Sequence, residues 1–478
     1  MEDKRIVNLS VKPFFTAIIM LVGIMTLTYI LTFILPSGEF DRELMPDGKL
    51  AIISGTYHHV EGGFSFFKWI LSPFLVFTTP DRVPVAVICL FLLFMGGGIL
   101  PLDECGCMRY MLDVIAHKYR KRRYTLLAVT SLFFMTLGSV VGSFEEAVPL
   151  VPVVIALSYS MGWDALVGLG MSLLPLGFGF SIGVCNIFTV GIAQRLAGLP
   201  LFSGISFRII SFAIIYPFIL WLLRSYTKRL DEDPKNSLVK SHALKGEILK
   251  ASTEFVRNDK LQKAVTRFAS IIGFGLLLII LSSFIQFLQD TITVIMAVIF
   301  LAAGTTGCLT AGMKGKEFLK QFGKGMATML PGAGIILMAS SIKYTLTESK
   351  TLDTVLNYAV ELTKGLSPFV VVLAIYALVL VMNFFIASAS AKAVFLIPLI
   401  IPLGQLNGIP NQLSVLAFIY GDGFSNLFYP TNPVLLICLG LVGIDYLTWA
   451  KWSTKFQLGV LAITCILLLI AKAVGYGA

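Results

Sequence analysis

Long apolar runs alternate with short polar and charged segments along the whole sequence. Runs of about twenty apolar residues are long enough to cross a hydrocarbon core roughly 30 Å thick. The apolar segments, some of them shorter than a full span, cover 14–35, 83–100, 126–141, 147–160, 165–199, 205–223, 268–287, 294–312, 326–342, 369–385, 393–406, 413–443 and 456–474. Two more stretches, 108–124 and 351–364, are predicted to form amphipathic helices at the membrane surface. The pattern therefore predicts an all-α polytopic membrane protein with the lipid bilayer as its surroundings.

The apolar pattern is interrupted at equivalent places in two halves of the chain. Residues 142–152 (Gly-Ser-Phe-Glu-Glu-Ala-Val-Pro-Leu-Val-Pro) align with residues 388–398 (Ser-Ala-Ser-Ala-Lys-Ala-Val-Phe-Leu-Ile-Pro), which makes Glu146 the equivalent of Lys392. Further on, residues 177–181 (Gly-Phe-Gly-Phe-Ser) match 421–425 (Gly-Asp-Gly-Phe-Ser). Interrupted apolar segments at corresponding positions of two halves are typical of secondary transporters built from repeats.

The distribution of charge predicts how the chain crosses the membrane. Segments rich in Lys and Arg are expected in the cytoplasm, and they are 117–123, 228–267 and 314–324. The acidic segment 36–81 is then expected outside, with the N-terminus in the cytoplasm and the C-terminus outside. The two halves have opposite orientations, so re-entrant hairpins at 126–160 and 369–406 enter from opposite sides. Two full crossings at 126–160 would also give an even number of crossings between the basic segments 117–123 and 228–267. The short second leg with Pro149 and Pro152 favours the hairpin.

The bulk composition supports the membrane interpretation and excludes other classes. The chain has 478 residues, of which 56% are hydrophobic and 13% charged, whereas a soluble domain carries about 25% charged residues. The formal net charge of +10 lies largely in the cytoplasmic loops, so it indicates topology and not a nucleic-acid partner. Seven scattered cysteines form no disulfide framework. Because the chain lacks Walker A and His-Glu-x-x-His motifs, we expect neither nucleotide-driven transport nor a metal site.

The candidate functional residues are polar groups within the apolar segments. A charged side chain near the bilayer centre costs about 2.5–3.5 kcal/mol on insertion scales, so it is a functional candidate. As repeat equivalents, Glu146 and Lys392 are expected to approach the symmetry axis from opposite sides. They either contact the substrate or form a structural ion pair between the hairpin tips. The predicted substrate-binding residues, at the tips and at the interruptions 177–186 and 421–433, are Ser143, Glu145, Glu146, Asn186, Ser388, Ser390, Lys392, Asp422, Asn426, Thr431 and Asn432.

The motifs 143–149 (Ser-Phe-Glu-Glu-Ala-Val-Pro), 420–426 (Tyr-Gly-Asp-Gly-Phe-Ser-Asn) and 430–433 (Pro-Thr-Asn-Pro) carry a family resemblance. Over nearly its whole length the chain resembles the C4-dicarboxylate anaerobic carrier (DcuC) family. Within that family it is similar to the YfcC-type basic amino-acid antiporters of the ion-transporter superfamily. In place of the Ser-Asn-Thr motif common at hairpin tips in the superfamily, it carries Ser-Phe-Glu-Glu and Ser-Ala-Ser-Ala-Lys.

The resemblance implies an elevator-type inverted-repeat transporter in the bacterial cytoplasmic (inner) membrane. It implies a scaffold domain that forms a homodimer, a transport domain of two opposed hairpins and two broken helices, and surface arm helices that join them. On this scheme the scaffold takes in 1–124 and 268–366, the transport domain takes in 125–224 and 367–478, and 225–267 is a cytoplasmic linker.

The function that the sequence favours is exchange of small amino acids, with arginine and ornithine as the type of substrate. Acidic Glu145, Glu146 or Asp422 suits a cationic group, and an α-carboxylate suits Lys392 or a helix N-terminus. The alternative is a C4-dicarboxylate or other carboxylate transporter coupled to H⁺ or Na⁺. No nucleophile–base pair or metal cluster indicates an enzyme, and paired broken helices suit alternating access better than a channel. No cofactor is expected apart from such a coupling ion.

Overall fold

The computed structural model describes residues 11–44, 50–119, 122–142, 144–239, 257–282, 285–363 and 365–477. The chain is nearly all helical, with 79% of it in helices. In the described part, 11 helices are long and apolar enough to cross a membrane. These observations confirm the prediction of an all-α polytopic membrane protein.

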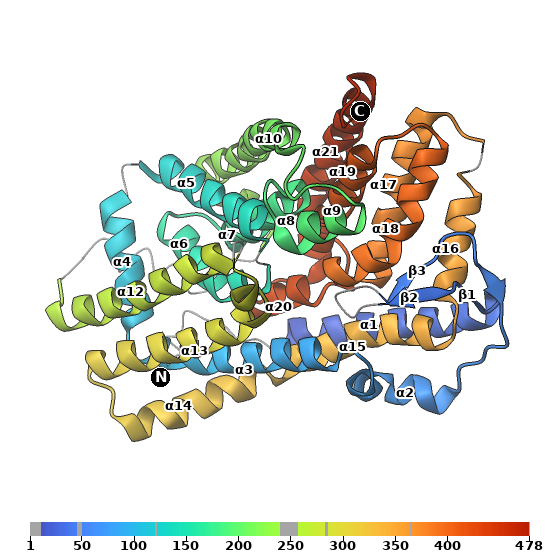
Figure 1. Cartoon of the computed structure of the whole chain (residues 1–478). Coiled ribbons are helices and arrows are strands. Elements are labelled where there is room, and N and C mark those ends of the chain that lie inside the picture. Colours follow the sequence, from blue (N-terminus) through green and yellow to red (C-terminus); the bar gives the residue numbers. More distant parts are fainter. Residues whose placement is uncertain are drawn as a thin grey trace.

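The helices form two layers, which Figure 1 shows one above the other. The lower layer consists of α1 (Val11–Ile34), α2 (Phe66–Leu75), α3 (Arg82–Glu104), α12 (Asp259–Ser282), α13 (Gln286–Ala311), α14 (Gly315–Thr328) and α15 (Leu330–Glu348). The short helices α4 (Cys107–Tyr119) and α16 (Leu352–Glu361) stand at its two ends and lead into the upper layer. Each layer therefore takes in one segment from each half of the chain.

Close backbone contact holds the lower layer together. Helix α3 lies between α13 and α14 and carries three consecutive glycines at 96–98. A Cβ atom added to Gly325 of α14 would lie only 2.2 Å from the carbonyl oxygen of Gly96. Small residues at such a crossing let two helix backbones approach within the membrane, where packing rather than the hydrophobic effect drives association. The glycines thus fix α3 and α14 against each other.

The upper layer contains two helical hairpins. In the first, α5 (Arg123–Thr136) continues into a π-helical turn η3 (Leu137–Val141), and the chain returns through the 3₁₀ turn η4 (Glu145–Leu150) and α6 (Val151–Ser160). In the second, α17 (Pro368–Phe385) and α18 (Ala389–Leu406) form the two legs. We call residues 142–150 the first tip and residues 386–392 the second tip. The helices of both hairpins coincide, to within a few residues, with the predicted apolar segments 126–160 and 369–406, and the re-entrant course of the hairpins stays a prediction.

Two helices of the upper layer are broken, and the breaks fall within the predicted interruptions. The first runs through α7 (Ala165–Met171) and α8 (Leu173–Ile182), breaks at 183–186, and resumes in η5 (Ile187–Gly191) and α9 (Ile192–Leu196). The second runs through α19 (Asn411–Gly421), breaks around the 3₁₀ turn η7 (Phe424–Leu427), and resumes in α20 (Pro433–Val442). Long helices complete each half, namely α10 (Ile205–Glu232) and α21 (Tyr446–Ala473).

The hairpins and broken helices pack in a pseudo-symmetric way. Helix α6 of the first hairpin packs on α20, and α18 of the second hairpin packs on α9. The breaks themselves meet where η7 lies against α8. Gly423, at φ +153°, comes so close that an added Cβ would lie 2.6 Å from Ser181 Cα. Ser181 Oγ also donates to the Tyr420 carbonyl oxygen at 2.9 Å. Each half of the chain therefore supports the break of the other.

Segments predicted to lie on the same membrane face are in contact. The loop after α1 forms two small antiparallel pairs, β1 (Gly38–Glu39) with β4 (His58–His59) and β2 (Arg42–Leu44) with β3 (Leu50–Ile52). This loop docks on the start of α16, where Arg42 Nη2 lies 2.7 Å from Asp353 Oδ2. At the other end of the molecule, Tyr110 Oη of α4 donates to Gln262 Oε1 of α12 at 3.1 Å. Which of these faces is cytoplasmic stays a prediction.

Two local predictions are wrong in detail. The amphipathic stretch 108–124 is not one α-helix, because Arg122 has a non-helical backbone with φ −130° and α5 begins after it at Arg123. The basic segment 314–324, predicted as a loop, belongs to helix α14, which packs along α3. Basic residues mark the membrane face of a segment, but they do not prevent it from forming a helix.

Candidate functional site

A buried group of charged and polar side chains joins the second hairpin to the second break. Lys392 Nζ lies 2.7 Å from Asp422 Oδ1, and both side chains are fully buried. The same ammonium group donates to Asn383 Oδ1 on α17. Asn383 Nδ2 in turn donates to Ser425 Oγ at 2.6 Å and to Asn426 Oδ1 at 2.9 Å. We call these five residues the Lys392 cluster.

Local structure explains how the Lys392 cluster forms. Ser388 caps the N-terminus of α18 by accepting a bond from the Ala391 amide at 3.4 Å, so Lys392 lies in the first turn of the helix. Asp422 lies at the end of α19, where the chain leaves the helix. Burial of two charges costs free energy unless they are paired and hydrogen-bonded, and here each charge offsets the other. The positive charge of Lys392 is therefore neutralised inside its own half of the chain.

A structural ion pair between Glu146 and Lys392 was one of the two alternatives for these residues, and it is not present in the described structure. The carboxylate that pairs with Lys392 belongs to Asp422, 30 residues further along the chain. The alignment of 177–181 with 421–425 makes Phe178 the equivalent of Asp422, so the first half offers no matching carboxylate. The repeat relates positions on the backbone, but it does not relate the side chains that those positions contact.

The two acids of the first tip have different surroundings. Glu146 is 7% exposed, and its Oε1 accepts a hydrogen bond from Thr293 Oγ1 of α13 at 2.7 Å. Glu145 is half-buried, and no hydrogen bond or ion pair joins its carboxylate to another residue that the structure describes. Successive residues of a 3₁₀ turn point about 120° apart, which separates the two side chains. Ser143 lies outside the described residues.

The first break is held by side chains from three elements. Asn186 caps η5, because its Oδ1 accepts bonds from the amides of Phe188 at 2.9 Å and Thr189 at 3.3 Å. Ser139 Oγ of η3 accepts from the Val184 amide at 3.1 Å. A predicted binding residue, Asn186, therefore has a structural role at a helix start. Its Nδ2 has no partner among the residues that the structure describes.

Arg208 is a buried cation that the sequence analysis missed. Its side chain is fully buried, and its guanidinium group donates to the carbonyl oxygens of Val184, Phe202 and Ser203. Nε and Nη2 reach the Val184 oxygen in the first break at 3.3 and 3.2 Å, and Nη1 reaches the Ser203 oxygen at 2.9 Å. Arg208 is the one charged residue in the apolar run 205–223, and this was the signal that could have identified it.

The second break has an equivalent donor. Trp449 Nε1 donates to the Leu427 carbonyl oxygen at 2.6 Å. Trp449 is the fourth residue of α21, as Arg208 is of α10. Asn432 caps α20 by accepting from the Leu435 amide at 3.2 Å. In both halves, therefore, the long helix after the break supplies a side chain that satisfies an exposed carbonyl of the break.

Several polar atoms beside the two breaks lack a protein partner. Buried polar side chains in proteins are nearly always hydrogen-bonded, so unpartnered ones mark places where a ligand or solvent molecule would bond. Among the described residues of the breaks, these atoms are Asn186 Nδ2, Thr189 Oγ1, Asp422 Oδ2 and Thr431 Oγ1. At the second tip, Ser388 is exposed and its Oγ lies 3.4 Å from Ser390 Oγ. The unpartnered groups are thus an amide donor, two hydroxyls and a carboxylate oxygen, which are the kinds of group that can bond to a small polar solute.

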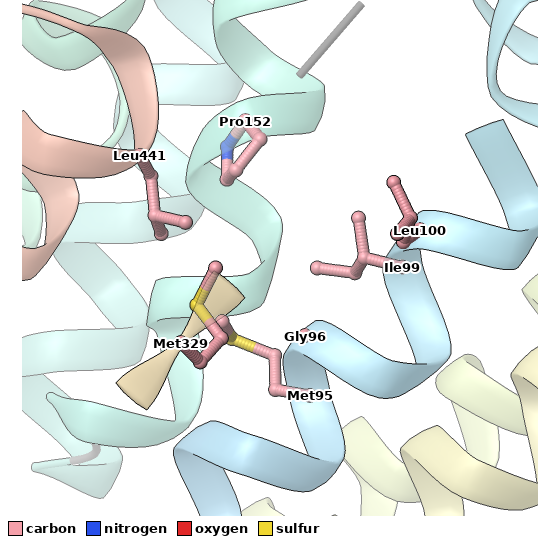
Figure 2. A pocket seen from close by; sticks show the side chains of 7 residues that line it. All are labelled: Met95, Gly96, Ile99, Leu100, Pro152, Met329 and Leu441. Atoms are coloured by element: carbon pink, nitrogen blue, oxygen red, sulfur yellow. The ribbon is translucent and has the colours of Figure 1, made fainter. Parts of the chain in front are cut away.

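An apolar hollow lies on the seam between the two layers. Figure 2 shows that only apolar groups line it. From the lower layer the lining residues are Met95, Gly96, Ile99, Leu100 and Met329, and from the upper layer they are Pro152 of α6 and Leu441 of α20. Apolar packing is non-directional, so this part of the seam contains no bond that fixes one relative position of the layers.

Comparison with known families matches residues 14–473 to the C4-dicarboxylate anaerobic carrier (DcuC) family. The fold and this match define a membrane transporter. The chain belongs to the DcuC family.

Two curated proteins are similar to the chain. "Putative basic amino acid antiporter YfcC" of Escherichia coli K12 is 27% identical over 423 residues, which cover 84% of this chain and 81% of that protein. An uncharacterized protein of Haemophilus influenzae Rd is 25% identical over 431 residues, covering 88% of this chain and 82% of that protein.

Solved transporter structures also match. The YdaH transporter of Alcanivorax borkumensis gives a TM-score of 0.47 at 18% identity, with 96% of this chain and 99% of that chain covered. MtrF of Neisseria gonorrhoeae gives 0.46 at 17% identity, with 95% and 94% covered.

Proposed function

We propose that the protein is a secondary active transporter that exchanges basic amino acids of the arginine and ornithine type. The observation that carries this proposal is the charge left available at the two tips. Glu145 is half-buried and is bonded to no other residue that the structure describes, whereas Lys392 is already paired with Asp422. A site with a free carboxylate and a neutralised ammonium attracts a cationic group. The name of the Escherichia coli relative agrees with this choice.

The α-carboxylate of such a substrate needs donors, and the second tip supplies them. The Ser388 and Ser390 hydroxyls lie at the N-terminus of α18, where unpaired amides favour an anion. The Lys392 ammonium group is already bonded to Asn383 and Asp422, so the N-terminus of α18 is the better receptor for the carboxylate. Glu145 at the first tip then receives the amino or guanidinium group.

A C4-dicarboxylate substrate fits the same site less well. Two carboxylates need two cationic partners, and the buried cations Lys392 and Arg208 are both engaged. Lys392 bonds to Asp422 and Asn383, and Arg208 bonds to backbone carbonyls around the first break. A dicarboxylate would therefore have to displace bonds that already stabilise the fold, whereas a cationic amino acid would not.

For the mechanism we propose elevator-type alternating access. In this scheme a transport domain, made of residues 125–224 and 367–478, moves against a scaffold. The scaffold is made of residues 1–124 and 268–366, and residues 225–267 are a linker. The apolar seam of Figure 2 supports sliding, because α6 and α20 can shift along α3 without breaking polar bonds there. Helices α4 and α16 would act as arms, with a homodimer formed through the scaffold. We place the protein in the bacterial inner membrane with the N-terminus in the cytoplasm.

The test is transport by purified protein in liposomes. Vesicles loaded with ornithine should take up labelled arginine, and uptake should depend on internal ornithine. Parallel vesicles loaded with succinate should take up no labelled succinate, and imposed H⁺ or Na⁺ gradients should not drive either uptake. Succinate uptake without arginine uptake would contradict the proposal and favour a carboxylate carrier in which Glu145 and Glu146 bind the coupling ion.

A further inference from the structure

Glu146 is bonded across the seam between the layers, and this bond has a consequence for transport. Its carboxylate belongs to the first tip, in the proposed transport domain, and its partner Thr293 belongs to α13, in the proposed scaffold. Thr293 Oγ1 lies 2.7 Å from Glu146 Oε1. Since Glu146 is only 7% exposed, little solvent is available to replace the bond when the tip begins to move. Movement of the first tip along α13 therefore requires that this bond break first.

We propose that the Glu146–Thr293 bond is a latch that holds the unloaded transport domain against the scaffold. The inference rests on the proposed function. It assigns Thr293, which has no place in the substrate site, as a positioning residue that makes transport an obligate exchange.

The two sides of the latch differ in rigidity. Helix α13 packs against both α3 and α12 and so belongs to the well-fixed lower layer. On the other side, the chain around Glu146 is a 3₁₀ turn that begins three residues after Gly142, which has φ +77°. Phe144 anchors this tip to α8 through its ring contact with Phe180, at 5.8 Å between centroids. The bond therefore connects a rigid scaffold helix to a tip that is itself tied to the broken helix.

The rest of the seam near the hollow of Figure 2 could not act as such a latch. Contacts among Met95, Ile99, Met329 and Leu441 are apolar and non-directional. A hydrogen bond to a carboxylate is directional and about twice as strong as one between neutral groups. A small number of such bonds can select one relative position of two layers that otherwise slide.

Substrate binding opens the latch because Glu145 and Glu146 are consecutive residues of one turn. The two side chains leave the turn in different directions, but a cationic group bound at Glu145 places a positive charge beside the next residue of the turn and draws the Glu146 carboxylate away from the Thr293 hydroxyl. A ligand shifts a conformational equilibrium only by its difference in affinity for the two states. Here the substrate binds the released tip better than the latched one. A loaded domain can then move and an empty one cannot, which is the condition for exchange without net flux.

The experiment compares net efflux with exchange in the same vesicles. Liposomes containing the protein are loaded with labelled arginine and diluted into buffer either without substrate or with ornithine. Thr293→Val removes the hydroxyl with little change of shape and should raise net efflux about tenfold or more relative to exchange. Thr293→Ser keeps a hydroxyl and should retain the wild-type ratio. Thr305→Val, which removes a hydroxyl bonded to the Leu301 carbonyl on the same helix, is the matched control and should also retain it.

The outcomes separate the latch from the proposed function. An unchanged ratio in Thr293→Val overturns the latch while leaving the exchanger intact. Loss of both net efflux and exchange in Thr293→Val also overturns it, because removal of a latch cannot slow the loaded domain. Absence of arginine–ornithine exchange in the wild type refutes the proposed function instead.

Discussion

The two hairpin tips occupy equivalent places in the repeat, yet their charges have different surroundings. Lys392 of the second tip lies in the interior of the upper layer, paired with Asp422 of the neighbouring break. Glu146 of the first tip points across the seam and bonds to Thr293 of the lower layer. One charge therefore links parts of a single layer, and the other links two layers. Sequence symmetry in this protein preserves the backbone arrangement and leaves each tip free to take a different role.

The difference has an energetic basis. Removing one partner of a buried ion pair leaves the other charge buried without a partner, and this strongly lowers the stability of the fold. Substitution of Lys392 is therefore expected to act mainly on stability. Neutralising the carboxylate of Glu145, which is half-buried and bonded to no other described residue, should change the stability of the fold little. Its substitution is therefore expected to act mainly on substrate binding. Substitutions at matched positions of the two halves can separate these effects.

The largest effect is expected from Lys392→Met, which leaves the Asp422 carboxylate buried without its cation. We expect a loss of about 3–5 kcal/mol of stability and no transport, measured as a lower melting temperature in detergent and absent exchange. The double variant Lys392→Met/Asp422→Asn removes both charges and should recover much of the lost stability. A single variant that melts like the wild type would show that the pair is not structural.

Arg208→Met should give the next largest effect, because it removes the donors that satisfy the Val184 carbonyl in the first break. Hydrogen bonds from a charged group are worth about 1.5–3 kcal/mol, so a loss of stability in this range is expected. Arg208→Lys keeps the charge but cannot reproduce the fork of bonds, and it should fall between wild type and Arg208→Met. Equal melting temperatures for all three proteins would contradict the role assigned to Arg208.

Glu145→Gln should leave the fold intact and weaken binding of a cationic substrate. We expect the apparent affinity for arginine to fall about tenfold or more, with an unchanged melting temperature. Glu317→Gln, at an exposed position of α14, is the matched control and should leave affinity unchanged. Wild-type arginine affinity in Glu145→Gln would remove this carboxylate from the site.

The smallest effect is expected from Trp449→Phe, which keeps the aromatic packing and removes the indole donor to the Leu427 carbonyl. Because a single neutral hydrogen bond contributes about 1 kcal/mol, a modest fall in melting temperature is expected. The comparison with Arg208→Met tests whether the first break depends more on its donor than the second. A larger loss in Trp449→Phe than in Arg208→Met would reverse that order.

Most of the architecture could be predicted from local patterns in the sequence. Runs of apolar residues predicted the spans, and the glycines and prolines at 177–186 and 421–433 predicted the breaks. These signals are local because helix length depends on hydrophobic thickness, and helix interruption depends on the residues at the break itself. The candidate site was predicted less completely. Asn383, a single amide in an otherwise apolar helix, and Thr293 went unnoticed although both bond to predicted residues.

The sequence by itself determined that this protein is a helical membrane transporter with two hairpins, two breaks and charged tips. Only the tertiary structure decided which charges are paired. The partner of Lys392 lies 30 residues away, and that of Glu146 lies 147 residues away on a helix of the other layer. The free energy of a buried charge depends on the groups within a few ångströms of it. Those groups are brought together by packing, so no pattern around Glu146 or Lys392 alone could have revealed them.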